Sequence, residues 1–129
     1  MTYRPRAKLV YLASPYSSPA AQIREIRFNM ITEIAADIVR RCPDVALFAP
    51  ITQSHPMAAY LQESTNNADF WLPIDMTLLL RCDELWVAEL PGWQDSVGVR
   101  AEIALAEKLG IPICSADQGI RACSVGSGR

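Results

Sequence analysis

The chain has 129 residues, of which half are hydrophobic and a fifth are charged, and its formal net charge is −2. This size and composition predict one globular domain with a hydrophobic core. The small negative charge argues against binding of long nucleic acid, and the apolar run Leu9–Ala13 is too short for a signal peptide or a membrane span.

The amino-terminal third predicts a strand followed by a long helix. The continuous apolar run Lys8–Ser14 is typical of a strand that is buried on both faces. Pro19 suits the first turn of a helix, for which Ser17 or Ser18 would be the cap. Apolar residues at helical spacing then continue to about Arg41.

The middle of the chain predicts two further strands and a second helix. Val45–Ala49 is a short apolar run typical of a strand, and Glu84–Ala88 is another. Between them, Ile51–Asn67 is irregular or weakly helical and has the composition of a functional loop. A helix is expected over roughly Phe70–Arg81, with Pro73 either in its first turn or kinking it.

The last third predicts a loop, a helix and a fourth strand. The amphipathic helix runs from about Asp95 to Leu109, and either Asp95 or Ser96 would cap it. Ile111–Cys114 predicts the fourth strand. Ser115–Arg129 is polar and ends in a Gly/Ser-rich segment, so we expect a disordered tail or an arm onto a neighbouring subunit.

Strands that alternate with helices predict an α/β fold, and residues 1–129 are expected to form one such domain. We expect a flavodoxin- or Rossmann-like, doubly wound parallel sheet of four to five strands with helices on both faces. Ligands of such folds bind beyond the carboxyl ends of the strands. The polar and aromatic residues that follow these ends are Ser14, Tyr16, Ser17, His55, Trp93, Asp95 and Ser96.

Two of the predicted helices each place one acid within an apolar stripe. These acids are Glu102 and Asp75. A carboxylate that faces the core is costly unless it is paired, hydrogen-bonded or lines a cavity. A single such acid could reflect a wrong helix phase, or a side chain that reaches solvent or an arginine. Two acids near one sheet edge instead predict a paired-carboxylate site, in which one acts as nucleophile and the other as acid in glycosidic bond cleavage.

The cysteines and the single histidine do not suggest a metal site. No two cysteines are spaced as CxxC, and none adjoins His55. A Cys/His metal site is therefore not expected. We expect the four thiols to be reduced, in a cytoplasmic protein.

Three motifs resemble one enzyme superfamily. The run Ser96–Glu102 resembles the Ser-x-Gly-Val-x-x-Glu segment of the 2'-deoxynucleoside 5'-phosphate N-hydrolases, and Asp75 precedes Asp83 with the family's spacing. Val10–Ser14 resembles the family's first strand with its tyrosine. The chain from about Val10 to Ile113 thus resembles the nucleoside 2-deoxyribosyltransferase superfamily, and within it a bacterial group of uncharacterised proteins, DUF1937.

This resemblance implies a covalent mechanism. Glu102 would attack the anomeric carbon and form a glycosyl-enzyme ester, which water or a second base then resolves. Asp75 would protonate or position the leaving base, and Tyr11 would orient the nucleophile or bind sugar. The predicted substrate-binding residues are Ser14, Tyr16, Ser17, His55, Trp93, Asp95, Ser96 and Gly98.

The individual binding roles rest on simple chemistry. Ser14, Ser17 and Ser96 could bind a 5'-phosphate, because helix amino termini favour anions, or they could serve only as caps. Gly98 would allow a ligand to approach closely. Trp93 could stack on a base or simply close its loop.

We therefore expect cleavage of the N-glycosidic bond of a (deoxy)nucleoside or its 5'-monophosphate, by hydrolysis or base transfer, without a metal or organic cofactor. Family members complete their sites across subunit contacts, so the resemblance implies a homo-oligomer, a dimer or a tetramer. We expect no membrane partner. The alternative is a non-catalytic nucleotide-binding or sensing module of the same fold. A third possibility is a structural partner protein in which the acids are relics.

Overall fold

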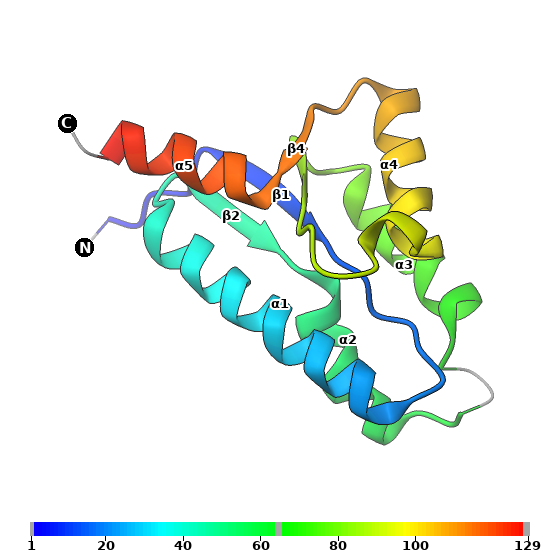
Figure 1. Ribbon diagram of the computed structural model, residues 1–129. Coiled ribbons are helices and arrows are strands. Elements are labelled where there is room, and N and C mark those ends of the chain that lie inside the picture. Colours follow the sequence, from blue (N-terminus) through cyan, green and yellow to red (C-terminus); the bar gives the residue numbers. More distant parts are fainter. Residues whose placement is uncertain (1, 64–65, 128–129) are drawn as a thin grey trace.

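A computed structural model describes residues 2–63 and 66–127, the last four of these by their backbone alone. The strands are β1 (Lys8–Ala13), β2 (Val45–Phe48), β3 (Glu84–Val87) and β4 (Ile113–Ser115). The helices are α1 (Ala21–Arg41), α2 (Pro50–Met57), α3 (Ala68–Leu79), α4 (Val97–Leu109) and α5 (Ala116–Ser127), with short 3₁₀ turns at Ala58–Tyr60 and Trp93–Asp95. Figure 1 shows the strands at the centre of the molecule with the helices around them.

The four strands form one parallel sheet in the order β2-β1-β3-β4. The chain moves from β1 to one side to form β2, and then crosses back to form β3 and β4 on the other side. The predicted doubly wound α/β fold is therefore confirmed. The winding direction changes between β1 and β3, and the carboxyl ends of two such strands form the crevice in which ligands of doubly wound folds bind.

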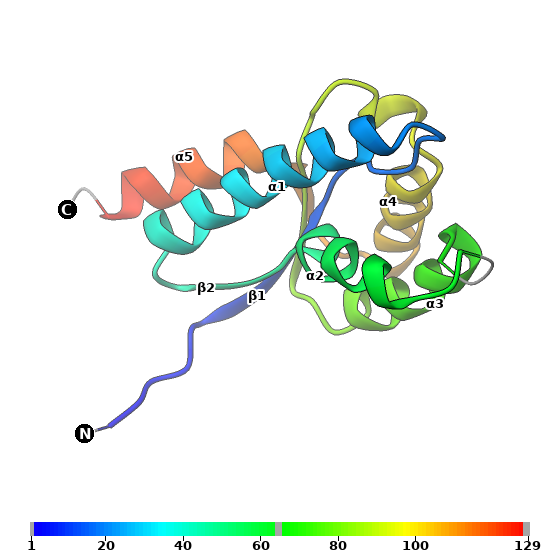
Figure 2. The same ribbon diagram turned by 90° about the horizontal axis from the view of Figure 1, so that it is seen from below.

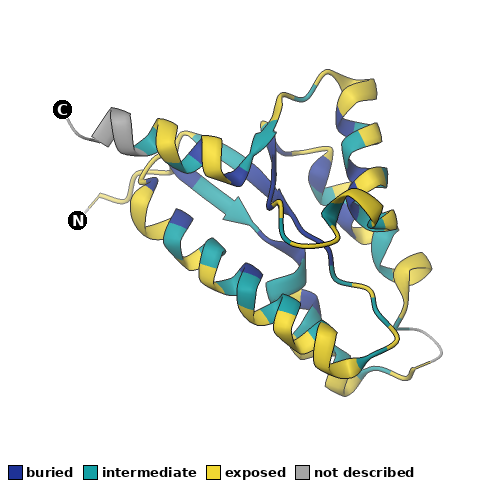
Figure 3. Ribbon diagram, in the orientation of Figure 1, coloured by how far each residue is buried: buried dark blue, intermediate teal, exposed yellow. Residues whose placement is uncertain are grey.

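The sheet separates two hydrophobic clusters, and β1 contributes to both. Val10 and Leu12 pack in the cluster that includes α1 and the start of α5, whereas Tyr11 and Ala13 pack in the cluster of α3 and α4. This alternation follows from the pleat, which points successive side chains to opposite faces. Figure 2 shows α1 and α5 on one side of the sheet and α3 and α4 on the other. In Figure 3 the buried residues lie along the strands and on the inward sides of the helices.

The predicted cap of α4 is confirmed at Ser96, whereas the caps predicted for the first long helix are wrong. α1 begins at Ala21, and neither Ser17 nor Ser18 caps it. Ser18 Oγ instead accepts a hydrogen bond from the Ala20 amide at 3.2 Å, within the preceding loop. α4 is capped by Ser96, whose Oγ accepts from the Val99 amide at 3.3 Å. The segment over residues 51–67, predicted to be irregular or weakly helical, contains most of helix α2, which starts on Pro50. Helix α3 begins at Ala68, so Pro73 lies inside this helix and not in its first turn.

A disordered tail or an arm was predicted for residues 115–129, but residues 116–127 form helix α5, and residues 128–129 lie outside the described part of the chain. Ala116, Gly119, Ile120 and Cys123 recur at helical spacing and turn toward the sheet and α1. A Cβ on Gly119 would lie 2.5 Å from the indole ring of Trp86, so the helix backbone rests directly on this ring. The apolar stripe is built mainly of small residues, which is why the polar composition concealed it.

Helix α5 is also joined covalently to α1. A disulfide links Cys42, which ends α1, to Cys123 of α5 across a sequence separation of 81 residues. The expectation that all four thiols are reduced is wrong for this pair, while Cys82 and Cys114 are free thiols. The sequence could not reveal the pairing, because it depends on where α5 packs.

Candidate active site

A pocket of about 590 Å³ opens at the carboxyl edge of the sheet. Its walls come from the loop after β1, the starts of α1 and α2, the segment before α3, α3 itself and the start of α4. Its position matches the crevice expected where the strand order changes direction. Seven predicted site residues line it, and these are Ser14, Tyr16, Ser17, Asp75, Ser96, Gly98 and Glu102.

Glu102 lies in the wall that α4 contributes. Its side chain follows the buried Val99 and precedes the buried Ala106 on the helix face that turns to the sheet, and only 4% of it is exposed. The hydroxyl of Tyr11, from β1, donates a hydrogen bond to Glu102 Oε2. Tyr11 does not itself line the pocket, so it holds the carboxyl from behind.

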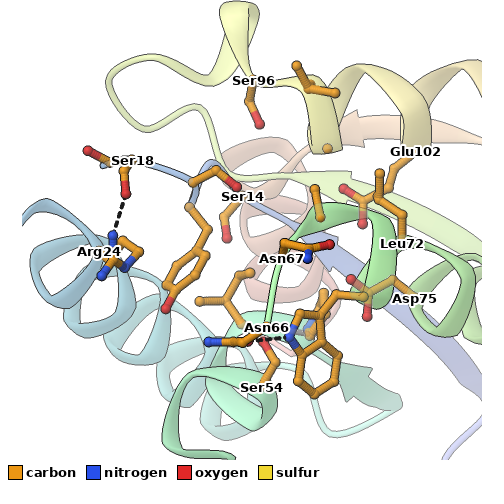
Figure 4. A pocket seen from close by; sticks show the side chains of 18 of the residues that line it. Ser14, Ser18, Arg24, Ser54, Asn66, Asn67, Leu72, Asp75, Ser96 and Glu102 are labelled. Carbon is orange, nitrogen blue, oxygen red and sulfur yellow. Dashed lines mark hydrogen bonds between the residues drawn. The ribbon is translucent and has the colours of Figure 1, made fainter. Parts of the chain in front are cut away.

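Asp75 comes to the same pocket from α3. It shares the inward face of the helix with Leu79, and 9% of it is exposed. In Figure 4 the carboxyl groups of Asp75 and Glu102 lie near one another on one side of the pocket. The two acids that the sequence placed in separate apolar stripes therefore do face a common site.

The environment raises the pKa of both acids. Burial raises the pKa of Glu102 to about 8, with the Tyr11 hydrogen bond opposing the rise and the charge of Asp75 adding to it. Burial raises the pKa of Asp75 to about 6. Burial, and then the charge of Glu102, raise the pKa of Tyr11 far above its ordinary value, so this hydroxyl remains a donor. Between pH about 6 and 8 the two carboxyls together hold one proton.

Ser14 provides an unused polar atom on the pocket wall. It follows β1 directly, is only 7% exposed, and its Oγ has no hydrogen-bond partner among the described residues. A buried hydroxyl without a partner is costly. A bound ligand that offers a polar group here would remove this cost.

Trp71 forms an aromatic part of the pocket wall and is not among the predicted site residues. Its Nε1 donates to Asn66 Oδ1 at 2.7 Å, so the polar atom of the indole is already engaged. Trp71 lies four residues before Asp75 on α3, and residues at this spacing share a helix face. This spacing was the available signal that an aromatic side chain accompanies the acid.

Arg24 was also missed. It is the cationic side chain in the pocket wall, and its guanidinium donates to the Ser18 carbonyl. Arg24 stands in the first turn of α1, where a positive charge is unfavourable to the helix dipole. A cation at such a position suggests a role other than helix stability.

Besides Tyr11, which lies behind Glu102, three predicted site residues do not line the pocket. Asp95 is exposed in the 3₁₀ turn before α4. Trp93 lines a separate hollow of about 240 Å³, together with Glu89 and Cys114. His55 stands behind Tyr16, to which it is hydrogen-bonded. Among the residues that the structure describes, no cluster of histidine, cysteine and acidic side chains could hold a metal ion.

Comparison with known proteins gives a family without an activity. The sequence profile described as "Domain of unknown function (DUF1937)" matches residues 8–117. No curated protein matches the sequence. Within the described ranges, no helix combines the length and the apolar character that crossing a membrane requires.

Proposed function

Since the chain belongs to the DUF1937 family, whose description names no reaction, we propose from the pocket itself that the protein cleaves the N-glycosidic bond of a nucleoside or nucleoside 5'-monophosphate. The observation that carries the proposal is the pair of buried acids. Glu102 accepts a hydrogen bond from Tyr11 and faces the same 590 Å³ pocket as Asp75. The motif resemblance to the nucleoside 2-deoxyribosyltransferase superfamily supports the proposal. We propose that the protein is also related to this superfamily.

In the proposed reaction Glu102 is the nucleophile. Its carboxylate attacks C1' of the sugar, the C1'–N bond breaks, and the electron pair goes to the base nitrogen, which takes a proton from Asp75. Water then attacks C1' of the ester, passes a proton to Asp75 and releases the Glu102 carboxylate. A second base that attacks in place of water gives transfer.

Substrate binding must control which of the two acids carries the proton. Both carboxyls have raised pKa values, about 8 for Glu102 and about 6 for Asp75, so the pair retains one proton near neutral pH, and the reaction needs this proton on Asp75. A base ring that covers Asp75 excludes water and raises the pKa of this acid further. Positive charge that develops at C1' favours ionised Glu102, as does the Tyr11 hydrogen bond.

The remaining pocket residues offer groups that could contact the base, the sugar and the phosphate of a nucleotide. The indole of Trp71 offers a flat apolar surface for a base. Arg24 and the unpartnered Ser14 hydroxyl offer a cation and a donor for a sugar hydroxyl or a 5'-phosphate. No organic cofactor has a part in this scheme.

The test measures by chromatography whether the protein releases free base. The substrates are a panel of deoxynucleosides, ribonucleosides and their 5'-monophosphates, each assayed with and without an acceptor base. We expect release by the wild type and loss of at least about 10³-fold in Glu102→Gln. Glu107→Gln is the matched control, because Glu107 is exposed on the same helix. If no compound releases base but one of them raises the melting temperature, the binding-module alternative replaces the enzyme.

A further inference from the structure

A chain of hydrogen bonds connects the surface of α1 to the wall of the pocket. The Tyr16 hydroxyl lies 2.6 Å from His55 Nδ1, and His55 Nε2 lies 2.7 Å from Glu25 Oε2. Tyr16 lines the pocket, His55 belongs to α2, and Glu25 belongs to α1 with 59% of its side chain exposed. Three separate elements thus meet at one imidazole.

The groups at the two ends of this hydrogen-bonded chain, Tyr16 and Glu25, determine the tautomer of His55. A Glu25 carboxylate can only accept, so His55 Nε2 must carry a hydrogen and donate it. In the neutral imidazole Nδ1 then has a lone pair, which accepts the Tyr16 hydroxyl hydrogen. The ring of Phe28 stacks on the imidazole at a centroid distance of 4.3 Å and holds its plane. Tyr16 therefore turns its hydroxyl to His55 and its ring toward the pocket.

The loop that carries Tyr16 is held from the α1 side as well. Arg27 donates to the Ser17 carbonyl at 2.8 Å, and Arg24 donates to the Ser18 carbonyl. These bonds hold backbone atoms, whereas the His55 bond, together with the Arg24 side chain beside the same phenol, holds the Tyr16 side chain. Burial raises the pKa of Tyr16, and the neighbouring Arg24 opposes that rise.

We propose that His55 is a positioning residue of the active site, which acts through Tyr16 and whose tautomer is set by Glu25. Glu25 and His55 lie outside the pocket lining, so substrate affinity depends on a surface carboxylate that does not touch the substrate. This inference rests on the proposed glycosidase function for its kinetic test, while the state of the imidazole can be tested without any substrate.

The kinetic test compares two amide variants, each of which can place a polar atom near one of the two ring nitrogens of His55. The side-chain amide of His55→Asn can place its oxygen where Nδ1 stood and accept from Tyr16, whereas the longer amide of His55→Gln reaches toward Glu25. We expect KM to rise about 3- to 10-fold in His55→Gln and in Tyr16→Phe, with kcat within about 2-fold, and His55→Asn to restore the wild-type KM. The double variant Tyr16→Phe/His55→Gln should be no worse than Tyr16→Phe alone.

The second measurement uses the fact that His55 is the only histidine in the chain. Long-range ¹H–¹⁵N NMR at pH 8 should show a single imidazole with the proton on Nε2. Glu25→Gln should shift the population toward the other tautomer, and Glu33→Gln, an exposed acid on the same helix, should not. The proposal is overturned if the wild type carries its proton on Nδ1, or if His55→Asn and His55→Gln raise KM equally. A wild type that releases no base would refute the proposed function, and the tautomer measurement would then decide this inference alone.

Discussion

Replacement of Glu102 by glutamine should stabilise the protein, and increasingly so as the pH rises. The folded-state pKa of Glu102 is about 8, against an ordinary value of 4.5. Below pH 4.5 the carboxyl is protonated in both states and costs nothing. Between these values the unfolded chain loses the proton while the fold retains it, so stability falls as pH rises and levels off above pH 8.

The size of this effect follows from the shift itself. A rise from 4.5 to about 8 corresponds to a loss of roughly 4 to 5 kcal/mol at pH values above 8. Glutamine keeps the acceptor for the Tyr11 hydroxyl and cannot ionise. The difference in unfolding free energy between Glu102→Gln and the wild type should therefore grow by roughly 3 kcal/mol or more between pH 5 and pH 8.5.

Urea denaturation at both pH values, followed by tryptophan fluorescence, measures this difference. The exposed-acid control Glu107→Gln should stay within about 0.5 kcal/mol of the wild type at each pH. A Glu102→Gln difference that is the same at pH 5 and pH 8.5 would refute the reasoning, because it would mean that Glu102 ionises in the fold without a desolvation cost.

Three other predictions concern the acid pair, the disulfide and α5. Base release should fall both below pH about 6 and above pH about 8, because the reaction needs one proton on the Asp75–Glu102 pair; a rate profile with a single limb would contradict this. Cys123→Ala should lower the unfolding free energy by roughly 4 kcal/mol in calorimetry or denaturation, because the disulfide closes a loop of 81 residues. The control Cys114→Ala, which removes a free thiol, should lower the unfolding free energy much less. Gly119→Ala should lower stability by about 1 to 3 kcal/mol, because its Cβ would lie 2.5 Å from Trp86; a raised melting temperature would show that the helix can move away from the ring.

Much of the fold was predictable because its signals are local. The buried strands appear in the sequence as apolar runs, and the predicted amphipathic helix, which is α4, ends at Leu109 as expected. The acids Asp75 and Glu102 were found because each interrupts an apolar stripe. A buried charge is rare enough for its position alone to be informative.

What the sequence could not show depends on contacts between distant segments. Helix α5 packs through small residues against Trp86, and its disulfide joins positions 81 residues apart. Trp93 follows the carboxyl end of β3, as pocket residues do, yet the 3₁₀ turn at its position directs it to another hollow. For Arg24 the sequence offers a different indication of a role in the site. A cation at the start of a helix is unfavourable to the helix dipole, and only this cost distinguishes Arg24 from other arginines.

The central place of β1 has a consequence for how the site moves. This strand pairs with β2 on one side and β3 on the other, and Val10 to Ala13 have no exposed surface. Amide hydrogens in such a strand exchange with solvent only when the whole domain opens, whereas the loop that carries Tyr16 can open locally. The back of the pocket, where Tyr11 holds Glu102, should thus keep its geometry on the timescale of substrate entry and product release, and adjustment to the substrate should fall to the loops at its mouth.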